Sequence, residues 1–274
     1  MSLSAQNVTV VKHGRTILDN VSVDAPAGLV TGLIGPNGAG KSTLLAALSG
    51  DLACAGGRVD IAGRDASTSS ARDLARLRSV MRQNVDVAFT FLVRDVVAMG
   101  RHPWGRSSRD ALLIDASLEA TGLFALQDRE VSTLSGGERA RAAFARVLAQ
   151  QTPVVLLDEP TAAMDVRYQE LTMGTARALA QAGAAVVVVL HDLQLAARYC
   201  DRVVCLKGGR VAAAGDVGEV YRDEILSDVY GWPIRVERAG GALFVLPGES
   251  SGNAPAIEVL VSATRHPTPA YPQP

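Results

Sequence analysis

Residues 35–43 read Gly-Pro-Asn-Gly-Ala-Gly-Lys-Ser-Thr and form the most informative stretch of the chain. It fits the pattern GxxxxGK[ST], in which glycines let the backbone curl so that successive N–H groups face phosphate oxygens. Lys41 adds a positive charge near the β- and γ-phosphates, and Ser42 offers a hydroxyl to Mg²⁺. The stretch therefore predicts a loop that binds a nucleoside triphosphate, made of Gly35, Pro36, Asn37, Gly38, Ala39, Gly40, Lys41, Ser42 and Thr43.

The sequence on either side supplies the strand and the helix that such a loop needs. An apolar run at residues 29–34 precedes it, and a helical pattern over 43–48 follows. Because the first N–H groups of a helix have no partners within the helix, a helix that begins at the loop presents them to phosphate. A purely structural glycine-rich turn is the alternative, but it does not predict these neighbours.

A second apolar run ends in two acidic residues. Residues 154–157 read Val-Val-Leu-Leu between Pro153 and Pro160, which is typical of a buried parallel strand. Such a strand would place Asp158 beside the phosphate loop, where it holds Mg²⁺ directly or through water. Glu159 would then polarise the attacking water as a general base. The alternative, an acidic turn after a strand, is weaker beside a complete phosphate loop.

Between these two regions lies Leu-Ser-Gly-Gly-Glu at 134–138, followed by a helical pattern over 139–149. Ser135 would cap the helix, while Gly136 and Gly137 would let a phosphate approach the free N–H groups of its first turn. A simple helix cap predicts neither the paired glycines nor the strand that follows. The segment resembles the signature motif of ATP-binding cassette (ABC) ATPases, which carry it just before a strand ending in Asp-Glu-Pro.

The resemblance covers about residues 4–247 and implies roles for three further residues. Gln83 is similar to the glutamine of the family's Q-loop, which senses Mg²⁺ and the γ-phosphate and links the nucleotide site to a membrane partner. Asp165 resembles the D-loop aspartate, which would contact the other protomer. His191 follows an apolar run at 184–190 and matches the switch histidine of the family. An isolated histidine at a strand end is more often a surface residue, but an imidazole that reaches the γ-phosphate completes the set.

These residues together form the site that the resemblance implies, with ATP and Mg²⁺ as its cofactors. The expected catalytic residues are Glu159, His191 and Lys41, and the expected metal ligands are Ser42, Gln83 and Asp158. Beyond residues 35–43, nucleotide contacts are expected from Gln83, Ser135, Gly136, Gly137, Glu138, Asp165 and His191.

One position departs from the family pattern. ABC ATPases usually stack an aromatic residue on adenine, and counting back from Leu18 places Lys12 there, with His13 adjacent. His13 could substitute for the aromatic residue, or the aliphatic stem of Lys12 could lie across the base. A loose preference for the base would follow.

The resemblance also implies the fold, which is α/β. We expect a RecA-like phosphate-loop ATPase core with N-terminal antiparallel β segments and an inserted, mainly helical subdomain. A single ABC ATPase domain would span 1–248, with the core at about 1–83 and 151–248 and the helical subdomain at about 84–150. Residues 249–274, a tail rich in Pro, Ser, Gly and Ala, are expected to be at least partly disordered.

Hydrophobic patterns and turn residues predict the individual elements. Strands are expected at 4–11, 20–23, 59–61, 154–157, 185–190, 203–207 and 210–214, with a hairpin turn at 207–210. Helices are expected at 71–77, 93–99, 109–121, 137–149, 166–182 and 193–199.

Composition restricts the partners and the location of the protein. The 27 basic and 28 acidic residues nearly cancel, which argues against bulk attraction to nucleic acid or to anionic lipid. The longest apolar run, at 184–190, is far shorter than the roughly 18 residues that suggest a membrane span. Residues 1–11 lack a basic segment followed by an apolar core, so export is not expected. Membrane attachment would therefore come from a partner.

Two further groups of residues receive structural interpretations. Cys54, Cys200 and Cys205 are too few and too scattered for a disulfide framework or a metal site, so we expect reduced thiols. The arginines of the segment after the signature motif, Arg139, Arg141 and Arg146, are interpreted as a solvated helix face.

Shorter motifs point to a subfamily. Gly-Arg-His-Pro at 100–103 resembles a GlyArgxPro element of importers for iron chelates, heme and cobalamin. Ala-Leu-Ser-Gly-Asp-Leu at 47–52, Val-Ala-Met-Gly-Arg at 97–101 and Val-Leu-Pro at 245–247 resemble hemin importer ATPases most. A ferric-siderophore or cobalamin importer shares most of these features and stays open as an alternative.

The family resemblance implies a set of partners. One cassette per chain implies a head-to-tail homodimer around two nucleotides, bound to two copies of a transmembrane permease at the cytoplasmic face of the inner membrane. A periplasmic or extracellular substrate-binding protein would act through the permease. A soluble, non-transport ABC ATPase is disfavoured, because those proteins carry two cassettes or a long coiled-coil insertion, for which the interval from Gln83 to Ser135 has no room.

Overall fold

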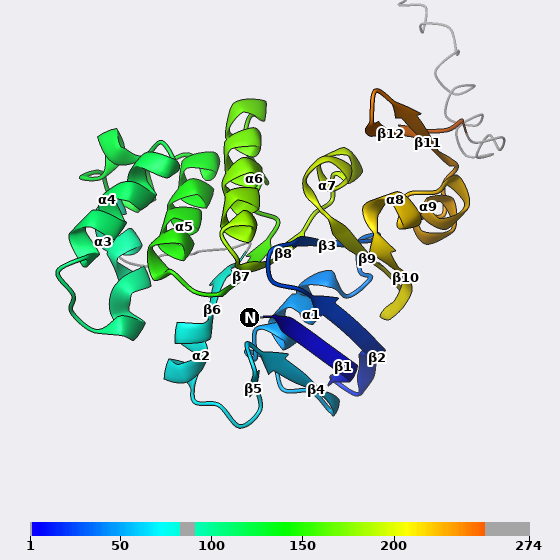
Figure 1. Ribbon diagram of the computed structural model, residues 1–274, viewed down its shortest axis with the longest axis horizontal. Helices are drawn as coiled ribbons and strands as arrows, with labels where there is room; N and C mark the ends of the chain where they lie inside the picture. Colours follow the sequence, from blue (N-terminus) through cyan, green and yellow to red (C-terminus); the bar gives the residue numbers. More distant parts are fainter. Residues whose placement is uncertain (1, 83–90, 250–274) are drawn as a thin grey trace, which may run out of the picture.

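The computed structural model describes residues 2–82 and 91–249 of the chain (Figure 1). Its centre is a six-stranded sheet in the order β10-β9-β3-β8-β7-β6. The strands are β3 (Val30–Ile34), β6 (Arg78–Met81), β7 (Val154–Asp158), β8 (Ala185–Val189), β9 (Arg202–Lys207) and β10 (Arg210–Asp216). Neighbouring strands are parallel except β10, which pairs antiparallel with β9. The loops after β3, β7 and β8 therefore meet at one edge of the sheet.

These three central strands are apolar because both faces of the sheet are covered. Every residue of β3, β7 and β8 is buried. A strand buried on both faces reads as a continuous apolar run rather than an alternating one. The predicted strands at 154–157 and 185–190 are thus confirmed with small changes at their ends.

A second, antiparallel sheet carries the N-terminus. It contains β1 (Leu3–Lys12), β2 (Arg15–Ala25), β4 (Gly56–Ile61) and β5 (Arg64–Asp65), in the order β2-β1-β4-β5. Helix α1 (Lys41–Leu48) contacts strands of both sheets, and its Leu44 and Leu48 are fully buried. The helix that follows the phosphate loop is therefore fixed between two layers (Figure 1).

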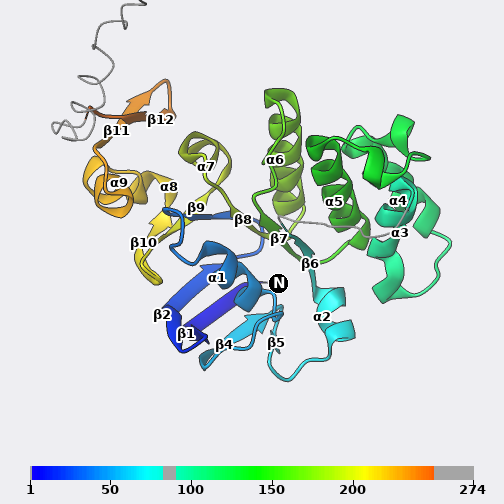
Figure 2. The ribbon, with the colours of Figure 1, turned by 180° about the vertical axis from the view of Figure 1, so that it is seen from behind.

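The opposite face of the central sheet is covered by α6 (Val166–Gln181) and α7 (Leu193–Tyr199), which contribute to one apolar cluster with it. A group of helices lies to the side (Figure 2) and contains α3 (Val93–Ala98), η1 (Met99–Trp104), α4 (Asp110–Ala120), η2 (Phe124–Leu126), η3 (Val131–Thr133) and α5 (Gly136–Gln150). This group has its own apolar cluster, built around Val97, Leu118 and Ala145. Helix α2 (Ala71–Leu77) precedes β6. The prediction of an α/β fold with N-terminal antiparallel strands and an inserted helical part is confirmed.

The end of the described chain forms an element that the sequence patterns did not predict. It consists of α8 (Val217–Val220), α9 (Asp223–Tyr230) and a hairpin of β11 (Ile234–Ala239) and β12 (Ala242–Pro247). We call residues 217–247 the C-terminal segment. It lies beside α7 and β9 (Figure 1).

Most predicted elements are confirmed, with two instructive differences. Helices 71–77 and 193–199 have the predicted bounds, and β9 and β10 form the predicted hairpin. Strand β6 was missed because Arg78-Ser-Val-Met81 is short and starts directly at the end of α2. The helix predicted at 93–99 is followed without a break by a 3₁₀ helix that runs through Gly100 to Trp104, beyond the predicted end.

The interpretation of three arginines as a solvated face was wrong for Arg141. Its side chain is buried and its Nη1 donates to the carbonyl oxygens of Thr121 and Gly122. The guanidinium also lies 3.8 Å from the ring centre of Tyr168. Arg141 thus joins α5 to the end of α4 and to α6, while Arg139 is exposed as expected and Arg146 is half-buried. A guanidinium can be buried where backbone carbonyls and an aromatic ring replace water.

The cysteines and the membrane prediction can also be checked. All three cysteines are free thiols, and those of Cys200 and Cys205 are buried. Within residues 2–82 and 91–249, no helix has the length and apolar character needed to cross a bilayer.

Candidate functional site

The phosphate loop follows β3 and turns tightly at two glycines. Gly35 has a φ of 142°, and a Cβ there would clash with the carbonyl oxygen of Leu206 in β9. Gly40 has a φ of 100°, and its Cβ would lie 2.8 Å from Leu18 Cδ2. Both positions require glycine, because other residues rarely adopt this backbone and no space is available for a side chain.

Lys41 is the first residue of α1 and is buried. Its Nζ donates hydrogen bonds to the carbonyl oxygens of Gly35, over 2.8 Å, and Pro36, over 3.0 Å. Burial lowers the pKa of the ammonium, and the charges of Glu159 and Asp158 oppose that shift. The lysine is therefore held over its own loop, next to the two acidic residues.

Asp158 ends β7 and lies against the start of α1. The Ser42 hydroxyl donates to Asp158 Oδ1 over 3.3 Å. Burial raises the pKa of Asp158 and the Glu159 charge adds to the rise, while Ser42 and Lys41 act against it. A hydroxyl and a carboxylate oxygen are ligands that Mg²⁺ prefers, so this pair fits the metal site that the sequence implies.

Glu159 and His191 form the second pair of the site. His191 Nε2 lies 2.6 Å from Glu159 Oε1, and the Glu159 N–H donates to the carbonyl oxygen of Val189 at the end of β8. Glu159 adopts a left-handed backbone with a φ of 49°. Such a conformation is uncommon for a residue other than glycine and costs about 1–3 kcal/mol, so its presence here marks the turn as a functional candidate.

Lys41, Ser42, Glu159 and His191 line one open cavity of about 320 Å³. The cavity is lined by Ile17, Asn37, Gly38, Gly40, Lys41, Ser42, Thr43, Glu159 and His191. The phosphate loop and the ends of β7 and β8 are thus brought together, as the spacing of the motifs predicts, and β2 adds Ile17. The size and the polar lining suit a polyphosphate.

The structure places Ile17, rather than Lys12 or His13, among the residues that line the cavity. His13 and Gly14 form the two-residue turn between β1 and β2, both with positive φ, and Lys12 is exposed. No sequence signal marks Ile17, because an isoleucine in a strand is read as a core residue.

The signature residues lie outside this cavity, at the start of α5. The Ser135 N–H donates to Glu138 Oε2 over 2.8 Å, and the Glu138 N–H donates to Ser135 Oγ over 3.3 Å. The hydrogen bond from the Ser135 backbone lowers the pKa of Glu138. Ser135 and Gly136 are exposed, and a Cβ at Gly137 would lie 2.8 Å from the carbonyl oxygen of Ala163.

Asp165 lies two residues after Ala163 and caps α6, where its side chain accepts the N–H of Tyr168 over 3.0 Å. Among the described residues, the predicted site is therefore split in two, with the phosphate loop, Asp158, Glu159 and His191 in one part and the signature residues and Asp165 in the other. Gln83 lies outside the described residues.

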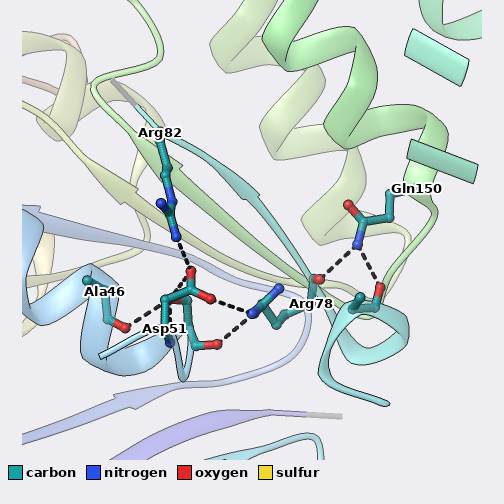
Figure 3. A network of polar contacts seen from close by, with 7 residues as sticks. Ala46, Asp51, Arg78, Arg82 and Gln150 are labelled. Atoms are coloured by element: carbon teal, nitrogen blue, oxygen red, sulfur yellow. Dashed lines mark hydrogen bonds and ion pairs between the residues drawn. The ribbon is translucent and has the colours of Figure 1, made fainter. Parts of the chain in front are cut away.

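A polar network joins the end of α1 to the strand that leads toward Gln83 (Figure 3). Asp51 Oδ1 accepts from Arg78 over 2.8 Å, and its Oδ2 accepts from Arg82 over 2.9 Å. Gln150, the last residue of α5, donates to the carbonyl oxygens of Ala75 and Arg78. Burial acts to raise the pKa of Asp51, but Arg82, Arg78 and Ser49 outweigh it and the pKa is lowered. The phosphate-loop helix, β6 and α5 are thus linked through polar contacts.

Comparison with known proteins assigns the family. The ABC transporter family profile matches residues 18–162. The hemin import ATP-binding protein HmuV of Rhodococcus jostii is 50% identical over 252 residues, covering 90% of this chain and 86% of the relative. The HmuV of Streptomyces coelicolor is also 50% identical, covering 90% of each chain.

A solved structure supports the same assignment. It is a dimeric ATP-binding cassette in a post-hydrolysis state with ADP and Pi, similar to this chain with a TM-score of 0.72 and 26% identity. The likeness covers 78% of this chain and 98% of that one. The chain therefore belongs to the ABC transporter family and is one of its nucleotide-binding ATPases.

Proposed function

We propose that the chain is the ATP-hydrolysing subunit of an importer that carries hemin across the cytoplasmic membrane. The observation that carries this proposal is the identity of half of the aligned residues, over nine tenths of the chain, to proteins named for hemin import. The local motifs at 47–52, 97–101 and 245–247 point the same way.

The geometry of the cavity supports specific roles for its residues. The N–H groups of the phosphate loop and of the first turn of α1 bind the phosphates, and Lys41 neutralises charge near the γ-phosphate. Ser42 and Asp158, joined by a hydrogen bond, would hold Mg²⁺, with Gln83 as a further ligand. When bound, Mg²⁺ screens the phosphate charges that develop in the transition state.

Hydrolysis requires a base beside the γ-phosphate. Glu159 accepts a proton from the attacking water, whose oxygen forms the new bond to phosphorus while the bond to the ADP oxygen breaks. His191, 2.6 Å from the carboxylate, orients Glu159 and reaches the γ-phosphate. The 2.6 Å contact holds the carboxylate beside the imidazole in the wall of the cavity that the phosphate loop also lines.

The second half of the site would come from another copy of the chain. Ser135 and Gly136 are exposed, and the cavity at the phosphate loop contains no signature residue from the described part of the chain. A head-to-tail homodimer would bring Ser135, Gly136, Gly137 and Glu138 of one copy to the γ-phosphate held by the other, with Asp165 at the contact. The exposed start of α5, whose residues do not line the cavity in the described part of the chain, favours this arrangement.

The division of the chain supports a coupling to a membrane permease. We assign the ATPase core to about 1–83 and 151–248 and the helical subdomain to about 84–150, within one domain over 1–248. The GlyArgxPro element lies in η1 of this subdomain, where Arg101 pairs with Asp110 and Trp104 Nε1 donates to the Gln150 carbonyl oxygen. His102 is exposed there and would pack in the permease interface.

Two copies of the permease, together with a substrate-binding protein, would complete the importer. The ATPase would then be peripheral, at the cytoplasmic face of the membrane.

A reconstitution in liposomes tests the substrate. The full chain is combined with its permease and binding protein, and ATP hydrolysis is compared with hemin, a ferric siderophore or cobalamin. We expect stimulation by hemin alone. Stimulation by a siderophore or by cobalamin would overturn hemin as substrate and leave the ATPase assignment in place, whereas no hydrolysis in any mixture would overturn both.

A further inference from the structure

A tyrosine from the C-terminal segment holds the phosphate loop. The backbone N–H of Gly35 donates a hydrogen bond to the hydroxyl oxygen of Tyr230, the last residue of α9, over 2.9 Å. The two residues are 195 positions apart in the chain. Burial raises the pKa of Tyr230, so the hydroxyl is neutral and its oxygen stays an ordinary acceptor.

The bond to Tyr230 holds Gly35, the residue whose carbonyl oxygen also accepts a hydrogen bond from Lys41. The carbonyl oxygen of Gly35 accepts from Lys41 Nζ over 2.8 Å, and a Cβ at Gly35 would clash with the carbonyl oxygen of Leu206. Gly35 is thus fixed at its N–H by Tyr230 and at its carbonyl by Lys41. Because no space is left beside the Gly35 backbone, loss of the hydrogen bond at its N–H would shift the rest of the phosphate loop.

A second tyrosine of the C-terminal segment reaches the other side of the site. Tyr221, which is fully buried, donates from its hydroxyl to the carbonyl oxygen of Leu193 over 2.9 Å. Leu193 begins α7, two residues after His191. Asp192, between them, caps the same helix by accepting the N–H groups of Gln194 and Leu195.

The first turn of α7 is also bound to the hairpin. Gln194 Nε2 donates to the Leu243 carbonyl oxygen over 2.6 Å, and Gln194 Oε1 accepts from the Val245 N–H over 3.0 Å. The C-terminal segment thus contacts both loops that carry phosphate-facing groups, the loop after β3 and the loop after β8. In the view of Figure 1 it lies on the side of α7 away from α6.

We propose that Tyr230 and Tyr221 are positioning residues of the ATPase, Tyr230 for ATP binding through Gly35 and Tyr221 for hydrolysis through the His191 loop. This inference rests on the proposed roles of the phosphate loop and of His191. Loss of the Tyr230 hydroxyl leaves the Gly35 N–H buried without a partner, and the loop relaxes away from the geometry that binds phosphate. Loss of the Tyr221 hydroxyl removes one of the contacts that hold the start of α7 and so loosens the adjoining His191, which acts on the chemical step.

Tyr230→Phe and Tyr221→Phe in the full chain test this division, because both keep the ring and its packing. Tyr199→Phe is the matched control, since Tyr199 lies on α7 but its hydroxyl donates to Glu170 of α6. Binding of a non-hydrolysable ATP analogue gives the dissociation constant, and steady-state hydrolysis gives KM and kcat. The melting temperature without nucleotide reports on folding.

We expect Tyr230→Phe to raise the dissociation constant for the analogue and KM about tenfold, with kcat at saturating ATP within about twofold of the wild type. Tyr221→Phe should lower kcat about tenfold and leave the dissociation constant within about twofold. Tyr199→Phe should change neither constant.

Two results would overturn the inference. One is that the two variants behave like Tyr199→Phe. The other is that both constants change together in proportion to a fall in melting temperature, which a merely structural role would produce.

Lys41→Ala separates this inference from the proposed function. If Lys41→Ala binds the analogue as well as the wild type does, the phosphate loop itself is wrongly assigned and the inference falls with it. If Lys41→Ala abolishes binding while the tyrosine variants are normal, only the inference fails.

Discussion

His191 Nε2 and Glu159 Oε1 lie 2.6 Å apart although 32 positions separate the two residues in the chain. They meet because β7 and β8 are parallel neighbours, and each residue lies just beyond the carboxyl end of its strand. The Glu159 N–H also donates to Val189 of β8 over 3.2 Å, so the two loops are joined by backbone as well as by side chains. The relationship places a carboxylate and an imidazole together at the edge of the phosphate-loop cavity.

The first prediction concerns Glu159→Gln. The amide keeps the shape of the side chain but does not accept a proton, so ATP should still bind while hydrolysis falls by about 10²- to 10⁴-fold. With ATP present, the variant should accumulate as a closed dimer. Light scattering measures the dimer and phosphate release measures hydrolysis. Turnover at the wild-type rate would remove Glu159 from the role of general base.

The second prediction concerns Ile17, which lines the cavity beside the phosphate loop. An aliphatic side chain packs against a base without reading its hydrogen-bonding edge. Ile17→Ala should therefore weaken ATP and GTP binding equally, by about 5- to 30-fold for the loss of about 1–2 kcal/mol of packing. Calorimetric titration with each nucleotide measures this.

Val11→Ala serves as the control for Ile17, because Val11 is an exposed aliphatic residue of the same hairpin. It should bind both nucleotides as the wild type does. Unchanged affinity in Ile17→Ala would show that the base lies elsewhere, and a loss confined to ATP would show that this wall reads the base.

The third prediction concerns the polar network around Asp51. Its partner Arg78 has a side chain only 12% exposed, so Asp51→Asn leaves a largely buried guanidinium without its counter-charge. We expect a loss of about 1–3 kcal/mol in the free energy of unfolding, measured by urea denaturation at pH 7. Asp228→Asn, which breaks an exposed pair with Lys207, should change it by less than about 1 kcal/mol. Equal effects of the two variants would contradict a structural role for the network.

The sign of the pH dependence follows from the lowered pKa of Asp51. A carboxyl whose pKa is lower in the folded state stabilises the protein above its unfolded pKa of about 3.9, and this contribution is lost as the pH falls toward the folded value. The difference between wild type and Asp51→Asn should therefore be constant from pH 7 to about pH 5 and shrink at lower pH. A difference that grows on acidification would contradict this.

The fourth prediction concerns the thiols. Burial raises the pKa of Cys200 to about 12 and that of Cys205 to about 12. Burial raises the pKa of Cys54 as well, but this side chain is only half-buried. Since a reagent must reach a thiolate to react, a disulfide reagent at pH 8 should modify Cys54 in the native protein and all three cysteines only after unfolding. Thiol titration with and without denaturant measures this. Rapid modification of Cys54→Ser in its native state would contradict the burial of the other two.

The same shifts predict the behaviour at alkaline pH. Between about 9 and about 12 the unfolded chain loses these thiol protons before the folded chain does, so stability should fall as the pH rises. The fall should be smaller in a Cys200→Ala, Cys205→Ala double variant, as urea denaturation at pH 8 and pH 10 would show. An equal fall would remove the thiols as its cause.

The site residues that the sequence predicts are those whose role a local sequence pattern indicates. The loop at 35–43, the Asp158–Glu159 pair and His191 each follow an apolar strand, and parallel pairing brings strand ends together. Ile17, Tyr221 and Tyr230 carry no such pattern, because their contacts join segments far apart in the chain. The burial of Arg141 likewise left no local pattern in the sequence. Its burial depends on carbonyl groups at the end of α4 and on Tyr168 of α6, which helix periodicity does not reveal.

The central claim is that this chain uses ATP to drive the import of hemin. The most direct test is hemin accumulation in proteoliposomes that contain the permease, with the binding protein and hemin on one side and this chain with Mg²⁺ and ATP on the other. We expect uptake that requires ATP, that stops with Glu159→Gln and that a non-hydrolysable ATP analogue does not support. Hemin accumulation that proceeds equally with Glu159→Gln, or none with the wild type while ATP is hydrolysed, would contradict it.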